Sequence, residues 1–252
     1  GLPEGTLVVW PESAMIEFYQ DIDGFVDDQG EAVAAKGGAL ISGLPWRDES
    51  RTPTTYHNSI AVVGTDSDDG VYHKQKLVPF GEYVPLQGLI RGLIPFFDLP
   101  MSSFTPGDSA QAPLRTEKAA LVPAICYEIA FSGLIQSLGQ KSQDQFTAIL
   151  TISNDTWFGD SWGPLQHFQI AQMRAIETGL PVIRGTNNGL TAVIASNGRV
   201  MEQIPRFERK VLAGAFVLDN KPTWFLQYGY WTLLVLVIGL LGVAFGLRGK
   251  LG

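Results

Sequence analysis

Apolar, β-branched runs recur along most of this chain, and segments with helical periodicity separate several of them. Eight runs have the composition of buried strands: residues 6–10, 39–44, 59–63, 119–125, 148–152, 182–185, 190–195 and 211–217. Helical patterns lie at residues 22–36, 129–138 and 164–178, and Asn197 with Gly198 predicts a hairpin turn. Strands interleaved with helices favour an α/β fold with at least one buried sheet, because each helix covers a sheet face. This alternation constrains the fold more than any other feature.

The C-terminal part of the chain differs from the rest, since residues 222–247 include no charged side chain. Its most apolar portion, residues 231–247, would form about 25 Å of helix at roughly 1.5 Å per residue. The aromatic residues around its start are typical of a membrane interface: Trp224, Tyr228, Tyr230 and Trp231. We therefore expect one domain at residues 1–220, then a transmembrane helix and a short tail at residues 221–252. A buried core helix is the alternative.

Charge and cysteine content exclude several classes of protein. Lys and Arg total 18 against 25 Asp and Glu, so the net charge is −7, whereas a nucleic-acid binder needs a basic face. One cysteine excludes an internal disulfide and a multi-cysteine zinc site. His57, His73 and His167 lack the spacing of metal ligands. We expect no nucleic-acid partner, no metal and no cofactor.

The lone cysteine, Cys126, is the first candidate for chemistry. It follows the apolar run 119–125 and precedes Tyr127 and Glu128. A thiol between a buried strand and a helix is held by rigid elements, and a neighbouring base can activate it. Taken alone, a buried structural cysteine is the more common interpretation.

Charged residues follow two other predicted strands. Glu12 comes just after residues 6–10, and glutamate is rarely buried without a partner, although it could instead begin a helix. Lys74 and Lys76 end an extended stretch, and a loop with proline and glycine then leads to Glu82. An ordinary charged edge strand is the alternative. Together these residues suggest a carboxylate that accepts a thiol proton, a thiolate that attacks a carbonyl, and an ammonium that stabilises the oxyanion.

The order of these segments over residues 5–217 resembles the nitrilase, or carbon–nitrogen hydrolase, superfamily. The resemblance implies an α-β-β-α sandwich and a Glu–Lys–Cys triad. It places the triad on Glu12 in VVWPES, Lys74 in YHK and Cys126 in ICYE. In a strand Lys74 and Lys76 would share a face, so alternation does not choose between them and the resemblance selects Lys74.

Within this superfamily the chain resembles the bacterial apolipoprotein N-acyltransferases. The motifs are YHK..LVPFGEYVPL at 72–86, FFDLPMSSF at 96–104, AICYEIAF at 124–131, LTISNDTWFG at 150–159 and the stretch 163–194. The resemblance implies a phospholipid acyl donor, a diacylglyceryl-modified apolipoprotein acceptor and a thioester on Cys126. Members of that family carry N-terminal membrane helices and an opening part of the sandwich that we do not find here. We therefore expect an N-terminally truncated sandwich with further segments upstream.

Supporting roles are predicted for three residues near the triad. Glu82 lies in the loop after Lys74, where a carboxylate would hold the ammonium in place. Tyr127 and Glu128 adjoin the nucleophile, and Glu128 would influence the local electric field. Solvated surface glutamates are the alternative, and they fit Glu128 better than Glu82.

Residues 86–97 have apolar side chains on one helical face and a single charged residue, Arg91. A core-facing helix and a lipid-facing lid both fit this pattern, and the pattern does not separate them. Under the lid interpretation Leu89, Phe96 and Phe97 bind substrate, and Trp157 is predicted to do the same.

Three functions fit the sequence. Acyl transfer through Cys126 leads, because a membrane helix and a lipid-facing segment suit a phospholipid substrate. A membrane-anchored hydrolase of amidase or nitrilase type, with water as acceptor, is the runner-up. A non-catalytic anchored binding module does not explain the three strand-end residues. The resemblance further implies the bacterial inner membrane, with a multi-pass full protein and a periplasmic catalytic domain.

Overall fold

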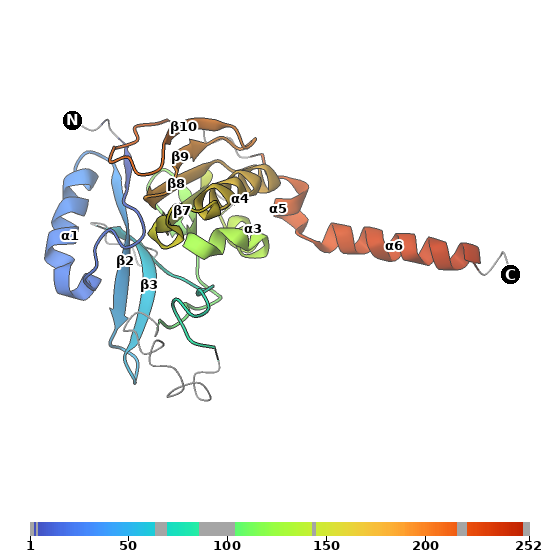
Figure 1. The fold of residues 1–252 in the computed structure, drawn as a ribbon, viewed down its shortest axis with the longest axis horizontal. Helices are drawn as coiled ribbons and strands as arrows, with labels where there is room; N and C mark the ends of the chain where they lie inside the picture. Colours follow the sequence, from blue (N-terminus) through green and yellow to red (C-terminus); the bar gives the residue numbers. More distant parts are fainter. Residues whose placement is uncertain are drawn as a thin grey trace.

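The computed structural model describes residues 3, 5–63, 70–85, 104–142, 145–215 and 221–248, and within them the strands form two sheets (Figure 1). The first sheet has the order β1 (Leu7–Val9), β2 (Ala39–Asp48), β3 (Thr55–Val63) and β4 (Val71–His73). The second has the order β10 (Val200–Ile204), β9 (Thr191–Ile194), β8 (Val182–Asn187), β7 (Thr147–Asn154), β6 (Ala120–Ile125) and β5 (Leu114–Arg115).

Helices cover the outer faces of both sheets. Helix α1 (Tyr19–Ala34) packs on β2 and β3, while α3 (Ser132–Gln140) and α4 (Gly163–Thr178) pack on the second sheet (Figure 1). Alternation along the strands builds two apolar layers, because successive side chains point to opposite faces. Ile41 and Ile60 lie in the core between the sheets, whereas Leu40 and Ala61 pack beneath α1. The layers therefore follow the expected α-β-β-α order.

Three adjacent strands of the second sheet, β6, β7 and β8, run parallel. All six residues of β6 are buried, as expected for a parallel strand covered on both faces. The carboxyl ends of neighbouring parallel strands meet at one edge of a sheet, where ligands commonly bind. The residues that end or follow these strands are Cys126 after β6, Asn154 in β7 and Asn187 in β8.

Some boundaries differ from the sequence-based expectation. The predicted strand 211–217 is wrong over residues 211–215, where no strand forms and Val211 is 95% exposed. Residues 216–217 lie outside the described part of the chain. Strand β10 was not predicted; the three central residues of its sequence VMEQI are exposed, so it lacks the apolar run of a buried strand. The hairpin turn is confirmed, since β9 and β10 are antiparallel and Gly198 adopts φ +81°.

The C-terminal segment forms α5 (Trp224–Tyr228) and α6 (Trp231–Arg248). Helix α6 projects away from the domain (Figure 1), and Leu233, Val235 and Leu236 are 57%, 67% and 58% exposed. The buried-core alternative is therefore wrong for this helix. Among the residues that the structure describes, no helix combines the length and hydropathy needed to cross a bilayer. The predicted transmembrane helix is thus not confirmed.

Candidate active site

Strand ends from both sheets bring polar side chains to one place. Glu12 follows β1 and Lys74 follows β4 in the first sheet, while Cys126 directly follows β6 in the second. The charges of Glu12 and Lys74 both act on the Cys126 thiol. The structure therefore brings the three predicted triad residues together.

Glu12, Lys74 and Glu82, here called the acid–base cluster, form a buried group of two carboxylates and one ammonium. Lys74 Nζ donates a hydrogen bond to Glu82 Oε1 at 2.9 Å and lies 3.7 Å from Glu12 Oε1. The Lys74 side chain is only 1% exposed. Burial alone would lower the pKa of Lys74, but the negative charges of Glu12 and Glu82 outweigh it and raise this pKa. Lys74 is thus a fixed cation at neutral pH.

Hydrogen bonds fix the position of Glu12. Asn58 Nδ2 donates to Glu12 Oε1 at 2.8 Å and also to Glu82 Oε1 at 2.8 Å. The backbone N–H of Asn154 donates to Glu12 Oε2 at 2.6 Å, and Asn187 Nδ2 donates to the Glu12 carbonyl at 2.9 Å. Sequence reasoning missed these three asparagines. For Asn58 a signal was available, because it is a polar residue within the buried part of strand β3.

Cys126 combines an uncommon backbone conformation with a half-buried thiol. It begins the short 3₁₀ helix η3 (Cys126–Ala130) with φ +48°, a left-handed value that side-chain-bearing residues rarely adopt. Burial and then the negative charge of Glu12 raise the pKa of the thiol to about 12, against the opposing effects of Lys74 and a hydrogen bond with Ser153. The resting thiol is therefore protonated at neutral pH, and a nucleophilic role requires a base to accept its proton as it attacks.

The two nearby lysines differ in burial, because Lys74 is buried and Lys76 is exposed. Strand β4 ends at His73, so the expected shared face for Lys74 and Lys76 does not exist. Lys76 is exposed, with its ammonium 5.9 Å from the centre of the Phe131 ring.

Glu128 is fully buried, so the surface alternative is wrong for it. It accepts hydrogen bonds from the Tyr72 hydroxyl at 2.9 Å and the Ile125 N–H at 2.9 Å. It also accepts from the N–H groups of Gln75 and Lys76. Burial raises the pKa of Glu128 despite these donors. Glu128 thus ties the loop after β4 to the start of η3.

Glu82 is also part of the interior, because its side chain is only 13% exposed. Besides Lys74 and Asn58, the backbone N–H of Val78 donates to Glu82 Oε2 at 2.8 Å. The carboxylate therefore holds its own loop against Lys74. The surface alternative is wrong for Glu82 as well.

A family comparison decides the class of this domain. The sequence profile described as carbon-nitrogen hydrolase matches residues 1–221. The chain belongs to the carbon–nitrogen hydrolase family. A curated relative, "Apolipoprotein N-acyltransferase" of Pseudomonas syringae pv. tomato, is 47% identical over 242 residues, covering 96% of this chain and 47% of that protein. The chain thus spans about half the length of the curated relatives it matches.

Solved structures of carbon–nitrogen hydrolases share the fold. A carbon-nitrogen hydrolase from Helicobacter pylori G27 superposes with a TM-score of 0.57 at 19% identity, covering 81% of this chain and 75% of that one. A branch 10 member of the nitrilase superfamily from Saccharomyces cerevisiae gives a TM-score of 0.54 at 16% identity, covering 81% and 74%. At these identities the likeness shows the fold alone, which confirms the nitrilase-type α/β domain.

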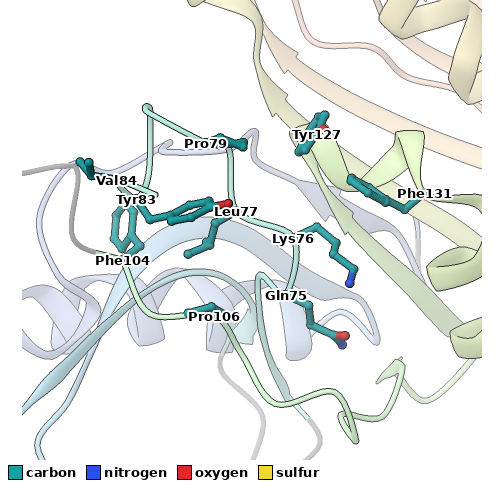
Figure 2. A pocket seen from close by; sticks show the side chains of 10 residues that line it. All are labelled: Gln75, Lys76, Leu77, Pro79, Tyr83, Val84, Phe104, Pro106, Tyr127 and Phe131. Carbon is teal, nitrogen blue, oxygen red and sulfur yellow. The ribbon is translucent and has the colours of Figure 1, made fainter. Parts of the chain in front are cut away.

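A cavity of about 590 Å³ in this carbon–nitrogen hydrolase domain is lined in part by Tyr127, the residue that follows Cys126 in the chain (Figure 2). It lies between the loop after β4 and the η3 region. Its lining is largely apolar and aromatic: Gln75, Lys76, Leu77, Pro79, Tyr83, Val84, Phe104, Pro106, Tyr127 and Phe131. Tyr127 packs edge-on against Phe131 with ring centres 4.9 Å apart. An acyl chain fits the chemistry of this lining.

The four residues predicted to bind substrate are Leu89, Phe96, Phe97 and Trp157, and the structure describes only the last of them. Leu89, Phe96, Phe97 and the whole segment 86–97 lie outside the described residues. Trp157 lies on the 3₁₀ helix η4 (Asp155–Phe158) and is 77% exposed. Its role in substrate binding stays a prediction.

Proposed function

We propose that this chain is the catalytic part of an apolipoprotein N-acyltransferase. The reaction would move a fatty acyl chain from a phospholipid to the α-amine of an N-terminal S-diacylglyceryl cysteine. One observation carries the proposal: a Lys74 ammonium buried between two carboxylates, beside the Cys126 thiol, in a chain 47% identical to a curated relative of that name.

The first half-reaction would load the enzyme. Cys126 Sγ attacks the ester carbonyl of the phospholipid while its proton passes to the Glu12 carboxylate. The carbonyl oxygen becomes an oxyanion, which Lys74 stabilises with an N–H not used by Glu82. The ester C–O bond then breaks, and Glu12 returns the proton to the departing lysophospholipid. A thioester remains on Cys126.

The second half-reaction would unload it. The α-amine of the acceptor attacks the thioester carbonyl, again with Lys74 at the oxyanion. The C–S bond breaks, and a proton from the amine returns through Glu12 to Cys126. The products are the N-acylated lipoprotein and the free thiol, so the same three residues serve both steps.

Selection of an amine over water would depend on the cavity lined in part by Tyr127. Its largely apolar lining, which includes Tyr127 and Phe131, favours an acyl chain and disfavours water. A thioester shielded in this way persists until an amine arrives.

Helix α6 would place the domain at a bilayer. Its large apolar side chains are exposed on all sides, which is costly in water and favourable in lipid. Its 18 residues make about 27 Å of helix, slightly less than the about 30 Å hydrocarbon core. The aromatic residues before it would lie at the headgroups. We propose the inner membrane, with the catalytic domain at the periplasmic face and the C-terminus inside.

The test is a mass measurement on the purified protein. After incubation with phospholipid, the peptide that contains Cys126 should gain the mass of one acyl chain, and an added diacylglyceryl peptide should remove it and become N-acylated. Cys126→Ala should form neither species. Product formation by this variant at the wild-type rate contradicts the mechanism, and release of free fatty acid instead of amide supports the hydrolase.

Topology needs a separate experiment. A membrane-impermeant protease added to spheroplasts should cut the domain and spare a tag placed after residue 252. Protection of the domain would refute the periplasmic assignment.

A further inference from the structure

A second group of buried polar side chains reaches Cys126, and the proposed mechanism does not use it. Asp155, His167 and Arg184, here called the Asp155 cluster, come from η4, α4 and β8. Arg184 Nη2 lies 2.8 Å from Asp155 Oδ2, and Asp155 Oδ1 lies 3.1 Å from His167 Nδ1. The side chains of Asp155 and Arg184 are completely buried. Burying these charges costs desolvation free energy, which their attraction offsets only when the distances and hydrogen bonds between them are well formed.

The second ring nitrogen of His167, Nε2, contacts the backbone of Cys126. His167 Nε2 lies 2.9 Å from the backbone carbonyl oxygen of Cys126. A carbonyl can only accept, so Nε2 carries the hydrogen and donates it. Arg184 Nη2 lies 3.2 Å from His167 Nδ1. The contacts of Asp155 and Arg184 with this nitrogen fix the orientation of the imidazole ring.

The residue held in this way has a strained backbone. Cys126 adopts φ +48°, and a left-handed side-chain-bearing residue persists only where its surroundings impose it. The Asp155 carboxylate is also linked to the Cys126 thiol through Ser153. The Ser153 hydroxyl donates a hydrogen bond to Asp155 Oδ1 at 2.5 Å and is hydrogen-bonded with the Cys126 thiol. Asp155 is thus linked to the backbone carbonyl of Cys126 through His167 and to the Cys126 thiol through Ser153.

We propose that His167, held by Asp155 and Arg184, is a positioning residue that fixes the backbone of Cys126 and thereby aims its thiol at Glu12 and Lys74. His167 touches no reacting atom. The inference rests on the proposed function only in taking Cys126 as the nucleophile.

Two amide substitutions of His167 each keep one of its two contacts and remove the other. The glutamine amide in His167→Gln reaches the position of Nε2 and keeps the donor to the Cys126 carbonyl. The asparagine amide in His167→Asn reaches the position of Nδ1 and keeps only the contact with Asp155. His167→Asn should lower kcat of acyl transfer about a hundredfold, the cost of an atomic misplacement near 1 Å, with little change in KM. His167→Gln should retain most of the wild-type kcat.

Alkylation of Cys126 by iodoacetamide gives a second measurement that needs no acyl transfer. Cys126 is the sole cysteine of the chain, so the mass gain reports on this thiol alone. Alkylation at pH 8 should be faster in His167→Asn, because a thiol released from burial and from Glu12 ionises more easily. It should be unchanged in His167→Gln. Ser142→Ala, which removes a buried hydrogen bond from Ser142 Oγ to the Gly139 carbonyl, controls for a general loss of stability and should leave alkylation unchanged.

Two results overturn the proposal: equal losses of kcat in the two His167 variants, or wild-type kcat and alkylation in His167→Asn. If the wild-type protein transfers no acyl chain, the proposed function fails. The alkylation rates then decide the positioning role by themselves.

Discussion

The acid–base cluster and the Asp155 cluster both bury opposite charges beside Cys126, but they differ in how completely those charges are satisfied. In the first, Lys74 is 2.9 Å from Glu82 and 3.7 Å from Glu12. The Glu12 carboxylate accepts two hydrogen bonds, from Asn58 and Asn154, which leaves lone pairs free. In the second, Asp155 interacts with Arg184, His167 and Ser153 at 2.5 to 3.1 Å.

The difference separates reacting groups from holding groups. A carboxylate with unused lone pairs beside a protonated thiol can accept a proton. A carboxylate saturated by a guanidinium, an imidazole and a hydroxyl gains little by accepting one. We therefore expect substitutions in the acid–base cluster to change rates, and substitutions in the Asp155 cluster to change stability and the placement of Cys126.

Glu12→Gln tests the reacting side most severely. The side chain keeps its size but loses the ability to accept the thiol proton, so acyl transfer should fall by about 10²–10⁴-fold. The pKa of the Cys126 thiol, raised to about 12 by burial and by Glu12, should fall once that negative charge is gone. Alkylation at pH 8 should therefore become faster while acyl transfer becomes slower. A parallel fall in both rates would contradict a base role.

Lys74→Ala tests the cation of the same cluster. Loss of an oxyanion donor should reduce kcat by about 100-fold or more. Lys76→Ala is the matched control, because Lys76 is exposed and pairs with neither Glu12 nor Glu82 in the described structure. Its activity should stay within a few-fold of wild type in the same acyl-transfer assay. The opposite ranking of the two variants would refute the choice of Lys74.

Asp155→Asn tests the holding side through stability. Breaking a buried ion pair costs about 3–5 kcal/mol, because Arg184 keeps an uncompensated charge. Burial alone would raise the pKa of Asp155, but the hydrogen bond between Asp155 and His167 and the charge of Arg184 hold this pKa below its ordinary value. The contribution is thus complete above about pH 4, the unfolded pKa, and is lost as pH falls through the lower folded pKa. Urea unfolding should show the gap between wild type and variant at pH 7 and a smaller gap in strong acid.

Two glycines provide a finer comparison, since one lies against each cluster. A Cβ at Gly43 would lie 2.7 Å from Glu12 Cα, and a Cβ at Gly189 would lie 2.1 Å from Asp155 Oδ2. Each alanine variant should lose about 1–3 kcal/mol of stability by overpacking. Gly43→Ala should have the larger loss of acyl transfer relative to its loss of stability. Equal ratios in the two variants would remove the functional distinction between the clusters.

The sequence by itself determined the α/β class of the fold and the strand ends that carry Glu12 and Cys126. These features follow from local patterns, because the length and apolar composition of a run specify a buried strand and the next residues leave its end. The same patterns mark α6 as apolar on all sides. The resemblance to a family, rather than any spacing, selected Lys74.

Only the tertiary structure decided what those charged residues contact. Glu128 is two residues from Cys126 and resembles a surface glutamate in sequence, yet it is buried and accepts hydrogen bonds from β6 and from the loop after β4. The contacts of Asn58 with Glu12 and those within the Asp155 cluster were not visible in any local pattern either, because these partners lie 12 to 46 residues apart. Burial and hydrogen bonding are properties of pairs that folding brings together, and a pattern along one strand or helix contains only one member of each pair.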